Sequence, residues 1–300
     1  MAEALHEDLI GPLRQALAGA GTLVIVPDGP LNVLPFAALR NPATGRFLIE
    51  DFRISITPSA TLLLSGDPEH RGEGAVAGVV WARAGARAEN LDALVVGNPL
   101  FSRARFGHLP DLPGAESEAV RVAALYPASA RLIGPAATKR RFLAEASRRS
   151  IIHFAGHAIP NEQRPELSAL VLSPGESGED EGVLFAREIA TLRFERARLV
   201  VLSACATAGG RLTRSEGVLN LVRPFLAVGV PAVVASQWDV EDDGSEQLLV
   251  RFHERLRAGF SPLDALRLSQ IDLLGSEDPT LRRPAVWAAF SLVTTSPLAQ

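Results

Sequence analysis

The chain has 300 residues, of which 47% are hydrophobic and 21% are charged. This balance is ordinary for a folded protein and excludes a disordered or fibrous chain, and the length fits one large domain or two smaller ones. The formal net charge is −4, arginine supplies all of the 30 basic residues except Lys139, and no run of like charge resembles a nucleic-acid footprint, so we expect no direct nucleic-acid partner.

The N-terminal part opens with an expected helix over residues 2–18, because four leucines recur every four residues on one face. Its acidic first residues do not suit a signal peptide. The next expected elements are a buried strand at 23–26, an extended stretch at 47–57 and a brief helix at 59–64. The following residues up to about 90 are rich in Gly, Ala, Arg and Glu, with a strand at Val76–Trp81. We expect a subdomain boundary there, at residue 88.

Beyond this boundary, apolar strands alternate with helices. Strands are expected at Ala93–Gly97, Ser150–Phe154, Ala169–Leu172, Leu199–Ser203, Ala232–Ser236 and Val286–Val293, and helices at Ala115–Tyr126, Lys139–Arg148, Glu216–Val228, Glu241–Arg257 and Pro262–Leu274. This alternation predicts an α/β fold with a mostly parallel sheet sandwiched by helices. The longest mainly apolar stretch, at 225–235, is too short to cross a bilayer, so we expect a cytoplasmic chain with no membrane span.

Two of these strands end in chemically reactive side chains, and reactive groups in parallel sheets gather at the carboxyl edge. The first strand carries His153 and His157, and the second carries Cys205, the only cysteine of the chain. A single cysteine cannot form an internal disulfide, so it is either a small core residue or a reactive thiol. A histidine on a neighbouring strand end can take the thiol proton and later protonate a leaving amine.

Dispersed motifs surround these residues in a definite order. They are His153–His157 (HFAGH), Leu202–Thr207 (LSACAT), Ala235–Asp243, Val26–Leu31 with Pro35–Leu39, Leu112–Glu116 and Trp287–Phe290. Together they resemble the CHAT peptidases, which are caspase-like cysteine peptidases related to separase, and the resemblance covers nearly the whole chain. The histidine motif precedes the cysteine by roughly 50 residues, as it does in caspases. The resemblance implies a caspase-like catalytic domain at 89–300 and a smaller, pseudo-caspase-like N-terminal subdomain at 1–88.

The resemblance also assigns roles to individual residues. His157 would be the general base and acid, and Cys205 would be the nucleophile. The backbone N–H of Cys205 and that of Gly156 or Ala158 would form the oxyanion hole, where losing one donor typically costs about 10²–10³ in rate. Ala206 departs from the acidic residue that commonly follows the nucleophile. This departure bears on a substrate contact and not on the Cys–His pair.

An acidic cluster of Asp239, Glu241, Asp242 and Asp243 follows the strand at 232–236. One interpretation is a solvated helix N-terminus, where carboxylates offset the helix dipole. The other comes from the resemblance, because caspase-like relatives often cleave after Arg or Lys and an acidic residue would line their P1 pocket. Asp242 occupies the usual aspartate position and is our first choice, followed by Asp239, which stands where relatives often have proline.

The remaining histidines and the tryptophans are expected to serve the fold. His153 and His157 lie about 13 Å apart on a strand, too far to chelate one metal ion together, so His153 is expected to be a packed residue near the site. We expect no metal and no cofactor. Trp238 and Trp287 are expected in the core, and surface or loop positions are expected for His6, His70, His108 and His253.

These residues predict a cysteine endopeptidase that cleaves a protein or peptide substrate through a Cys–His dyad and an acyl-enzyme. A catalytically silent interaction module with the same fold is the alternative. A glutaminase of the amidotransferase type is disfavoured, since Ser203 and Thr207 replace the glycines of its Gly-x-Cys-x-Gly elbow. Gly209 and Gly210 match neither phosphate-binding glycine motif, which disfavours nucleotide binding.

The resemblance further implies regulation, in bacterial defence or signalling. CHAT domains commonly lie downstream of helical repeats that receive a signal, so an activating partner or a helical-repeat sensor is expected. The glycine-rich and charged segments at 161–182 and 206–215 flank the expected site. We expect them to become ordered on activation or substrate binding.

Overall fold

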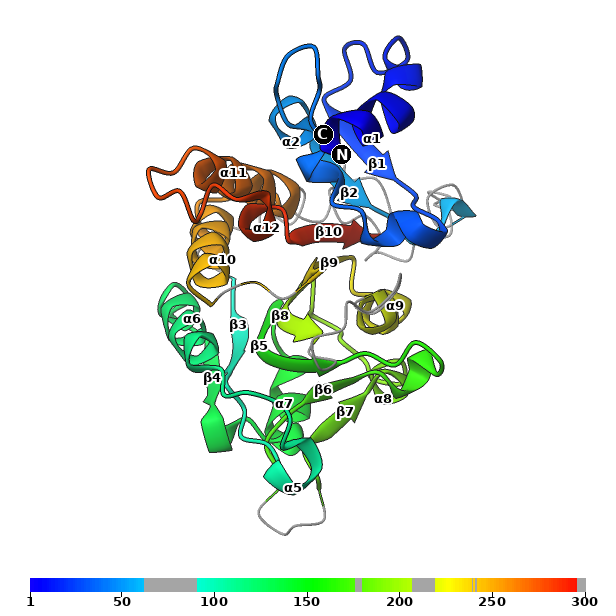
Figure 1. Ribbon diagram of the computed structural model, residues 1–300. Helices are drawn as coiled ribbons and strands as arrows, with labels where there is room; N and C mark the ends of the chain where they lie inside the picture. The colour runs from blue at the N-terminus through cyan, green and yellow to red at the C-terminus, as the bar shows by residue number, and fades with distance from the viewer. Residues whose placement is uncertain (62–90, 176–179, 207–218, 239, 241, 296–300) are drawn as a thin grey trace.

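The computed structural model describes residues 1–61, 91–175, 180–206, 219–238, 240 and 242–295. The expected strand at Val76–Trp81, the boundary at residue 88 and most of the expected helix at 59–64 lie outside these residues. Figure 1 shows the N-terminal elements at the top of the view and the remaining strands and helices below them.

The ten strands of the described residues form one sheet, in the order β1-β2-β10-β9-β8-β5-β3-β4, with β6 and β7 added beside β5. Neighbours pair in parallel except β10 with β9, β5 with β6, and β6 with β7. The strands are β1 (Thr22–Ile25), β2 (Arg53–Ile56), β3 (Ala93–Gly97), β4 (Ala130–Ile133), β5 (Ile151–Ile159), β6 (Ala169–Val171), β7 (Val183–Phe185), β8 (Leu199–Ala206), β9 (Ala232–Ser236) and β10 (Phe290–Thr294).

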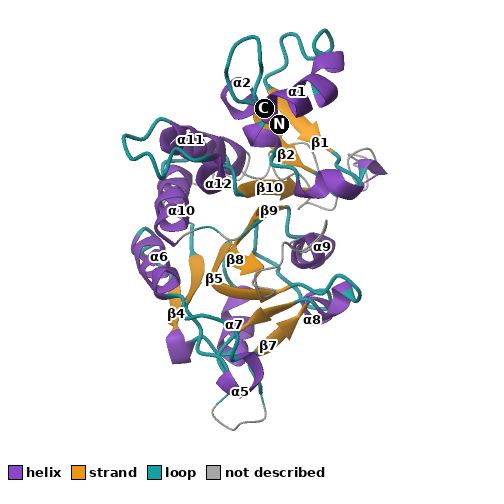
Figure 2. Cartoon of the chain, in the orientation of Figure 1, coloured by secondary structure: helices purple, strands orange, loops and turns teal. Residues whose placement is uncertain are grey.

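Helices cover both faces of this sheet (Figure 2). The α-helices are α1 (Ala2–Leu9), α2 (Leu48–Asp51), α5 (Arg103–Phe106), α6 (Pro113–Ala124), α7 (Lys139–Ala146), α8 (Ala186–Ile189), α9 (Leu219–Ala227), α10 (Asp242–Arg257), α11 (Pro262–Leu274) and α12 (Pro284–Trp287). Short 3₁₀ turns are η1 (Gly11–Leu13), η2 (Gly29–Val33), η3 (Phe36–Ala38), η5 (Gly134–Ala136) and η6 (Pro165–Leu167).

The two helical layers bury alternate residues of the same strands, because side chains along a strand point to opposite faces. In β3, Ala93 and Val95 belong to the core cluster that includes residues of α6, α10, α11 and α12, whereas Leu94 and Val96 belong to the cluster that includes residues of α7, α8 and α9. Strands buried on both faces read as continuous apolar runs, which is why the sequence predicted them well. The mostly parallel sheet sandwiched by helices is confirmed.

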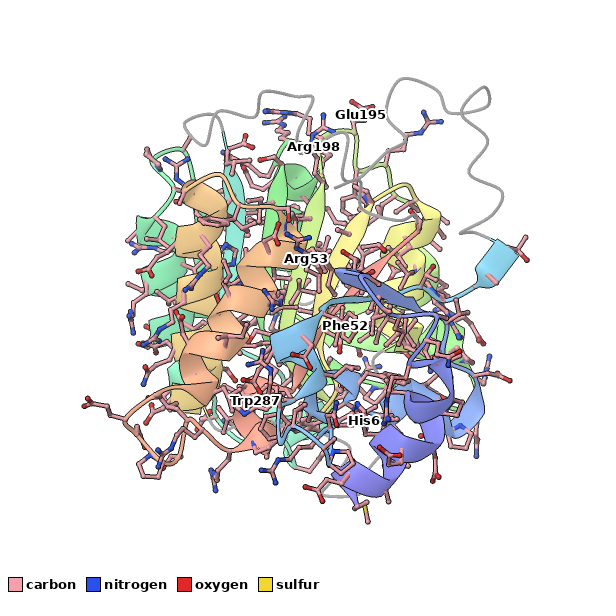
Figure 3. The ribbon with its side chains drawn as sticks, turned by 90° about the horizontal axis from the view of Figure 1, so that it is seen from above. His6, Phe52, Arg53, Glu195, Arg198 and Trp287 are labelled. Carbon is pink, nitrogen blue, oxygen red and sulfur yellow. The ribbon has the colours of Figure 1, made fainter. Side chains whose placement is uncertain are left out.

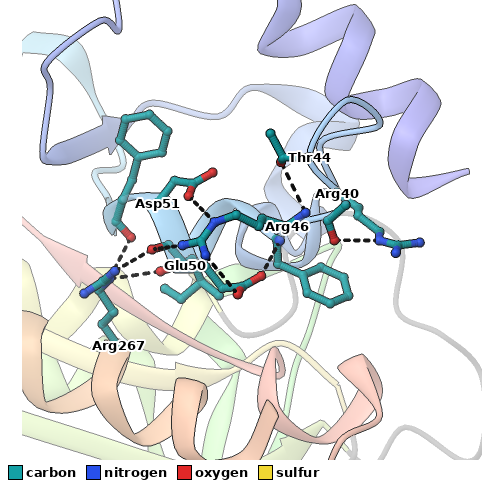
Figure 4. Close-up of polar contacts among 10 residues, drawn as sticks. Arg40, Thr44, Arg46, Glu50, Asp51 and Arg267 are labelled. Atoms are coloured by element: carbon teal, nitrogen blue, oxygen red, sulfur yellow. Dashed lines mark hydrogen bonds and ion pairs between the residues drawn. The ribbon is translucent and has the colours of Figure 1, made fainter. Parts of the chain in front are cut away.

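The N-terminal elements are attached to the rest by polar contacts from α11 (Figure 4). Arg267 donates hydrogen bonds to the backbone oxygens of Ile49, Glu50 and Phe52 at 2.8 to 3.2 Å. Nearby, Arg53 of β2 forms an ion pair with Asp264 at 2.7 Å. Burial and the neighbouring arginines lower the pKa of the Arg267 guanidinium, although it stays a cation at neutral pH.

Aromatic packing reinforces this attachment. Trp287 of α12, labelled in Figure 3, is fully buried, and its ring meets Phe47 edge to face with centroids 5.2 Å apart. Its indole N–H donates to the Arg282 oxygen at 3.1 Å. The core position expected for Trp287 is therefore confirmed, whereas Trp238 is only partly buried and bonds to the Ala285 oxygen.

The surface positions expected for the histidines hold for only one of the three described. His108 is exposed, but His6 is 4% exposed and His253 is wholly buried in α10. His253 lies on the helix face that packs against the sheet, and its buried polar partners compensate for the lost water. His70 lies outside the described residues. Among the helices that the structure describes, none is long and apolar enough to cross a membrane.

Candidate active site

The candidate histidine and cysteine lie on adjacent strands at the carboxyl edge of the sheet. Strands β5 and β8 are parallel, and their register pairs His157 with Cys205. Opposite residues of neighbouring strands are about 4.8 Å apart, and their side chains leave the same face. The register therefore brings the two strand positions together, while the side chain of Cys205 lies outside the described part of the structure.

The orientation of His157 is set by a backbone oxygen that the sequence did not reveal. Its imidazole is 2% exposed, and Nε2 lies 2.8 Å from the carbonyl oxygen of Pro110. A carbonyl oxygen can only accept, so Nε2 carries the hydrogen of this bond. In the neutral ring, Nδ1 is then the basic nitrogen, which is the tautomer that a general base needs.

The loop between β3 and α6 supplies this oxygen and is itself held by arginine contacts. The Phe101 ring meets His157 edge to face at 5.1 Å, and the Arg103 guanidinium lies 4.4 Å above the Phe101 ring. Arg103 also donates to the Leu109 oxygen at 2.9 Å and pairs with Asp111. These contacts fix both ends of the loop segment that carries Pro110.

The candidate oxyanion donors lie in the same strand pair. Along β5, the N–H and C=O groups of successive residues point alternately to the two neighbouring strands. The Ser150 oxygen accepts from the N–H of Leu199 of β8, and the Ala155 oxygen accepts from the N–H of Asn98 on the β3 side. Even-numbered residues of β5 therefore direct their N–H toward β8, so in this register the N–H groups of Gly156 and Ala158 lie in the hydrogen-bonded ladder between the two strands. The register pairs these two residues with Ala204 and Ala206, on either side of Cys205.

Close packing explains the glycine at position 156. A Cβ atom there would lie 3.0 Å from Cδ of Pro99 and 3.1 Å from Cζ of Phe154, which is tighter than ordinary contact. Position 158, two residues further along β5, accepts a methyl group, since Ala158 is buried among apolar side chains. Glycine thus lets the loop after β3 approach the strand beside His157.

The structure describes only part of the acidic cluster. Asp239 and Glu241 lie outside the described residues, and Asp242 begins α10 although its side chain is not described. Asp243 is exposed at the start of the same helix. Within the described part of the chain, no group of three or more His, Cys, Asp or Glu residues could hold a metal ion.

His153 is fully buried, as expected, and lies on the same face of β5 as His157. Its Nε2 faces Glu118 of α6 at 2.9 Å, and its Nδ1 lies 3.1 Å from His253 of α10. Burial and repulsion from His153 lower the pKa of His253 well below its ordinary value of 6.5. The sequence did not point to this cluster, because its members lie on three separate elements.

A family model described as "CHAT domain" matches residues 1–295. The chain belongs to the CHAT domain family. Tetratricopeptide repeat protein 28 of mouse and of human is 26% identical to this CHAT domain over 335 aligned residues, which cover 97% of the chain. The chain spans only 13% of the length of those relatives.

Solved structures show the fold of this CHAT domain. The match to the separase–securin complex of Saccharomyces cerevisiae covers 97% of the CHAT domain and 17% of the matched yeast chain, with 16% identity and a TM-score of 0.52. The Arg specific cysteine proteinase gingipain R matches 68% of this chain and 46% of that chain, with 9% identity and a TM-score of 0.43. The caspase-like architecture expected from the motifs is confirmed by the separase match and the sheet order.

Proposed function

We propose that this CHAT domain is a cysteine endopeptidase in which Cys205 is the nucleophile and His157 the general base and acid. One observation carries the proposal: the β5–β8 register sets His157 opposite Cys205, and the Pro110 oxygen fixes the histidine tautomer whose Nδ1 is basic. A thiol beside such a base is the arrangement that nucleophilic catalysis requires.

The proposed reaction proceeds in two halves. His157 Nδ1 takes the thiol proton while the sulfur attacks the scissile carbonyl carbon, and the N–H groups of Cys205 and of Gly156 or Ala158 bind the resulting oxyanion. The C–N bond then breaks as the imidazolium protonates the departing amine, leaving a thioester. Water gives a proton to Nδ1, attacks the thioester carbon and releases the carboxylic acid and the thiol.

The substrate is proposed to be a protein or peptide with a basic P1 residue. Asp242 is the first candidate for the P1 carboxylate and Asp239 the second, on the family resemblance. The division into a subdomain at 1–88 and a catalytic domain at 89–300 belongs to the same proposal. A protein partner or a helical-repeat region is proposed to regulate cleavage, in keeping with the tetratricopeptide repeats named in the relatives.

The central test replaces each member of the pair. Cys205→Ala and His157→Ala are each expected to lower peptide cleavage by about 10³-fold or more, since removing either partner removes the activated nucleophile. Cleavage is measured on peptides that differ only at P1, and covalent capture by matching peptidyl electrophiles is measured by mass at Cys205.

His108→Ala is the matched control, because His108 is an exposed histidine and, although it lies in the loop that carries Pro110, it supplies neither the Pro110 oxygen nor the arginine contacts that hold the loop. It is expected to keep wild-type activity. Undiminished cleavage in the Cys205 or His157 variant contradicts the proposal. A wild-type domain that neither cleaves peptides nor reacts with the electrophiles, even with its native partner added, supports the silent interaction module instead.

A further inference from the structure

Four buried side chains and the half-buried Ser203 form a chain of polar contacts on the sheet face that also carries the candidate site. Ser203 Oγ donates to Glu118 Oε2 at 3.1 Å, and Glu118 Oε1 lies 2.9 Å from His153 Nε2. His153 Nδ1 lies 3.1 Å from His253 Nε2, and His253 Nδ1 lies 2.8 Å from the Tyr126 hydroxyl. We call these five residues the Glu118 chain.

On the same sheet face, the Glu118 chain lies nearer the N-terminal ends of β5 and β8 than the candidate pair does. Ser203 precedes Cys205 by two residues on β8, so the two share a face about 7 Å apart along the strand. His153 lies on the same face of β5 as His157, four residues before it. The carboxylate of Glu118, which is 2% exposed, thus links α6 to both strands that carry the pair.

Helix α6 packs closely against the sheet at the residue next to Glu118. At Gly97 of β3, a Cβ atom would lie 2.3 Å from Cβ of Ala119, the residue that follows Glu118. Ala119 itself is wholly buried. The distance between the backbone of Glu118 and the strands is therefore set by close packing of α6 on β3, and not by a flexible side chain.

The hydrogens of the chain have a consistent order. Burial raises the pKa of the Tyr126 hydroxyl, and burial with repulsion from His153 lowers that of His253, so both are neutral at pH 7. An order consistent with this has Tyr126 O–H donating to His253 Nδ1 and His253 Nε2–H donating to His153 Nδ1, which leaves His153 Nε2–H beside the carboxylate at 2.9 Å. Glu118 thus accepts a hydrogen bond from Ser203 of β8 and lies in close polar contact with His153 of β5.

Stability alone does not explain such a chain. A buried carboxylate is costly, and apolar side chains of similar volume commonly stabilise a core as well or better. What the polar chain adds is direction: Glu118 Oε1 and His153 Nε2 lie 2.9 Å apart, although neither atom forms a well-aligned hydrogen bond among the described residues. A shift of β8 against β5 would break one of the two carboxylate contacts.

We infer that Glu118 is a positioning residue whose two carboxylate contacts, to Ser203 of β8 and His153 of β5, hold these strands in the register that sets His157 opposite Cys205. The inference rests on the proposed peptidase function. It assigns Ser203 and His153 the same role, and neither residue touches the substrate.

Two pairs of variants test this inference. Glu118→Ala removes both contacts, whereas Glu118→Gln keeps them: its amide oxygen accepts from Ser203, and its amide N–H donates to His153 once the two histidines exchange tautomers. Ser203→Ala removes one contact, whereas Ser203→Thr keeps the hydroxyl. Glu116→Gln, an exposed carboxylate on the same helix, is the control.

The readouts are kcat and KM for a cleaved peptide and the rate and pH profile of Cys205 alkylation by iodoacetamide. We expect kcat to fall about 10- to 100-fold in both alanine variants, with KM changed less than about twofold, because small misplacements of reacting groups have effects of this size. Alkylation at pH 7 is expected to slow in parallel. Glu118→Gln, Ser203→Thr and the control are expected to stay within about threefold of wild type.

The inference is overturned if the wild-type domain is active and both alanine variants keep its kcat and alkylation profile, even with a lower melting temperature. If Glu118→Ala does not fold, the Ser203→Ala and Ser203→Thr pair decides by the same criteria. A wild-type domain that cleaves nothing and alkylates like a free thiol contradicts the proposed function itself, a different outcome from either of these.

Discussion

At the scale of single residues, the candidate site depends on a backbone atom. The Pro110 oxygen fixes the hydrogen on His157 Nε2, whereas the aspartate of a catalytic triad fixes it on Nδ1 and leaves Nε2 as the base. Because a carbonyl oxygen is uncharged, it orients the ring without stabilising the imidazolium as strongly as a carboxylate does. No side-chain substitution at position 110 removes this acceptor, since the oxygen belongs to the main chain.

The buried histidine of α10 makes stability depend on pH. The pKa of His253 is well below 6.5 in the folded chain and near 6.5 in the unfolded chain, so below pH 6.5 the unfolded state binds a proton that the folded state excludes. The contribution of His253 is full above pH 6.5 and is lost as the pH falls. The limiting slope for one proton is about 1.4 kcal/mol per pH unit.

We therefore expect His253→Gln to flatten the decline of the unfolding free energy between pH 6.5 and 5, measured by urea denaturation. The groups that face His253 are His153 of β5 and Tyr126, with Arg257 lying over the Tyr126 ring. His108→Gln, an exposed site, is expected to keep the wild-type slope. Equal slopes in all three proteins contradict the prediction.

At the scale of elements, α6 and β3 approach each other closely near the site. An alanine at Gly97 would meet Ala119 Cβ at 2.3 Å and the Ala115 oxygen at 2.9 Å. Gly97→Ala must displace the helix or the strand, and we expect it to lower the unfolding free energy by about 2–3 kcal/mol, as overpacking does. Chemical denaturation measures the loss.

The matched control is Gly11→Ala, where the new methyl group would be 3.5 Å from its nearest neighbour, Oε2 of Glu7. It is expected to change the unfolding free energy by less than about 0.5 kcal/mol. If Gly97→Ala is as stable as this control, the contact between α6 and β3 is not the constraint that we describe.

Much of the fold was predictable because parallel strands buried on both faces are apolar throughout. Strands β3 and β9 and helix α11 begin and end where the sequence predicted, and β5 and β8 run several residues longer than expected. Small residues such as Ala155 and Gly156 were interpreted as strand ends, whereas they continue the strand. The short strands β4 and β7 were not predicted, since three or four residues carry too little periodicity.

Local breaks account for the other differences. The helix expected at 2–18 ends at Leu9, because Gly11 and Pro12 follow and proline lacks the N–H that a helix interior needs. The extended stretch expected at 47–57 contains the helical turn α2, in which the Glu50 carboxylate accepts from the Phe47 N–H at 2.7 Å. A glutamate three residues after the turn begins is a capping signal that could have revealed it.

For the candidate site, the sequence identified the two residues on the strand ends but not what surrounds them. The register of His157 with Cys205 follows from two apolar strands ending at one edge, which the sequence contains. The Pro110 oxygen has no side-chain signature, and Glu118 and His253 come from helices whose rotation about their axes the motifs did not indicate. Their positions depend on tertiary packing.

At the scale of the whole molecule, Arg267 is one of two arginines that join the N-terminal elements to α11, the other being Arg53. Arg267→Met removes all donors to the Ile49, Glu50 and Phe52 oxygens while keeping an apolar stem. We expect the unfolding free energy to fall by about 2–3 kcal/mol, the usual loss for hydrogen bonds to a charged group. Hydrogen exchange is expected to show lower amide protection in β1 and β2 and little change in β5 and β8.

Arg14→Met is the control for this change, because Arg14 forms an exposed ion pair with Glu7, a kind of pair that contributes little. It is expected to leave exchange in β1 and β2 unchanged. Equal protection in both variants would show that aromatic contacts such as Phe47 with Trp287 hold the N-terminal elements without Arg267.

The position of β10 also determines when the sheet can be finished during synthesis. Residues 290–294 fill the gap between β2, made of residues 53–56, and β9. While the chain is emerging from the ribosome, β2 and β9 therefore present open edges until residues 290–294 have also emerged. Open parallel edges invite pairing with other chains. Stalled or truncated products that lack β10 should thus depend on chaperones, whereas a chain that includes β10 closes both edges with a single strand.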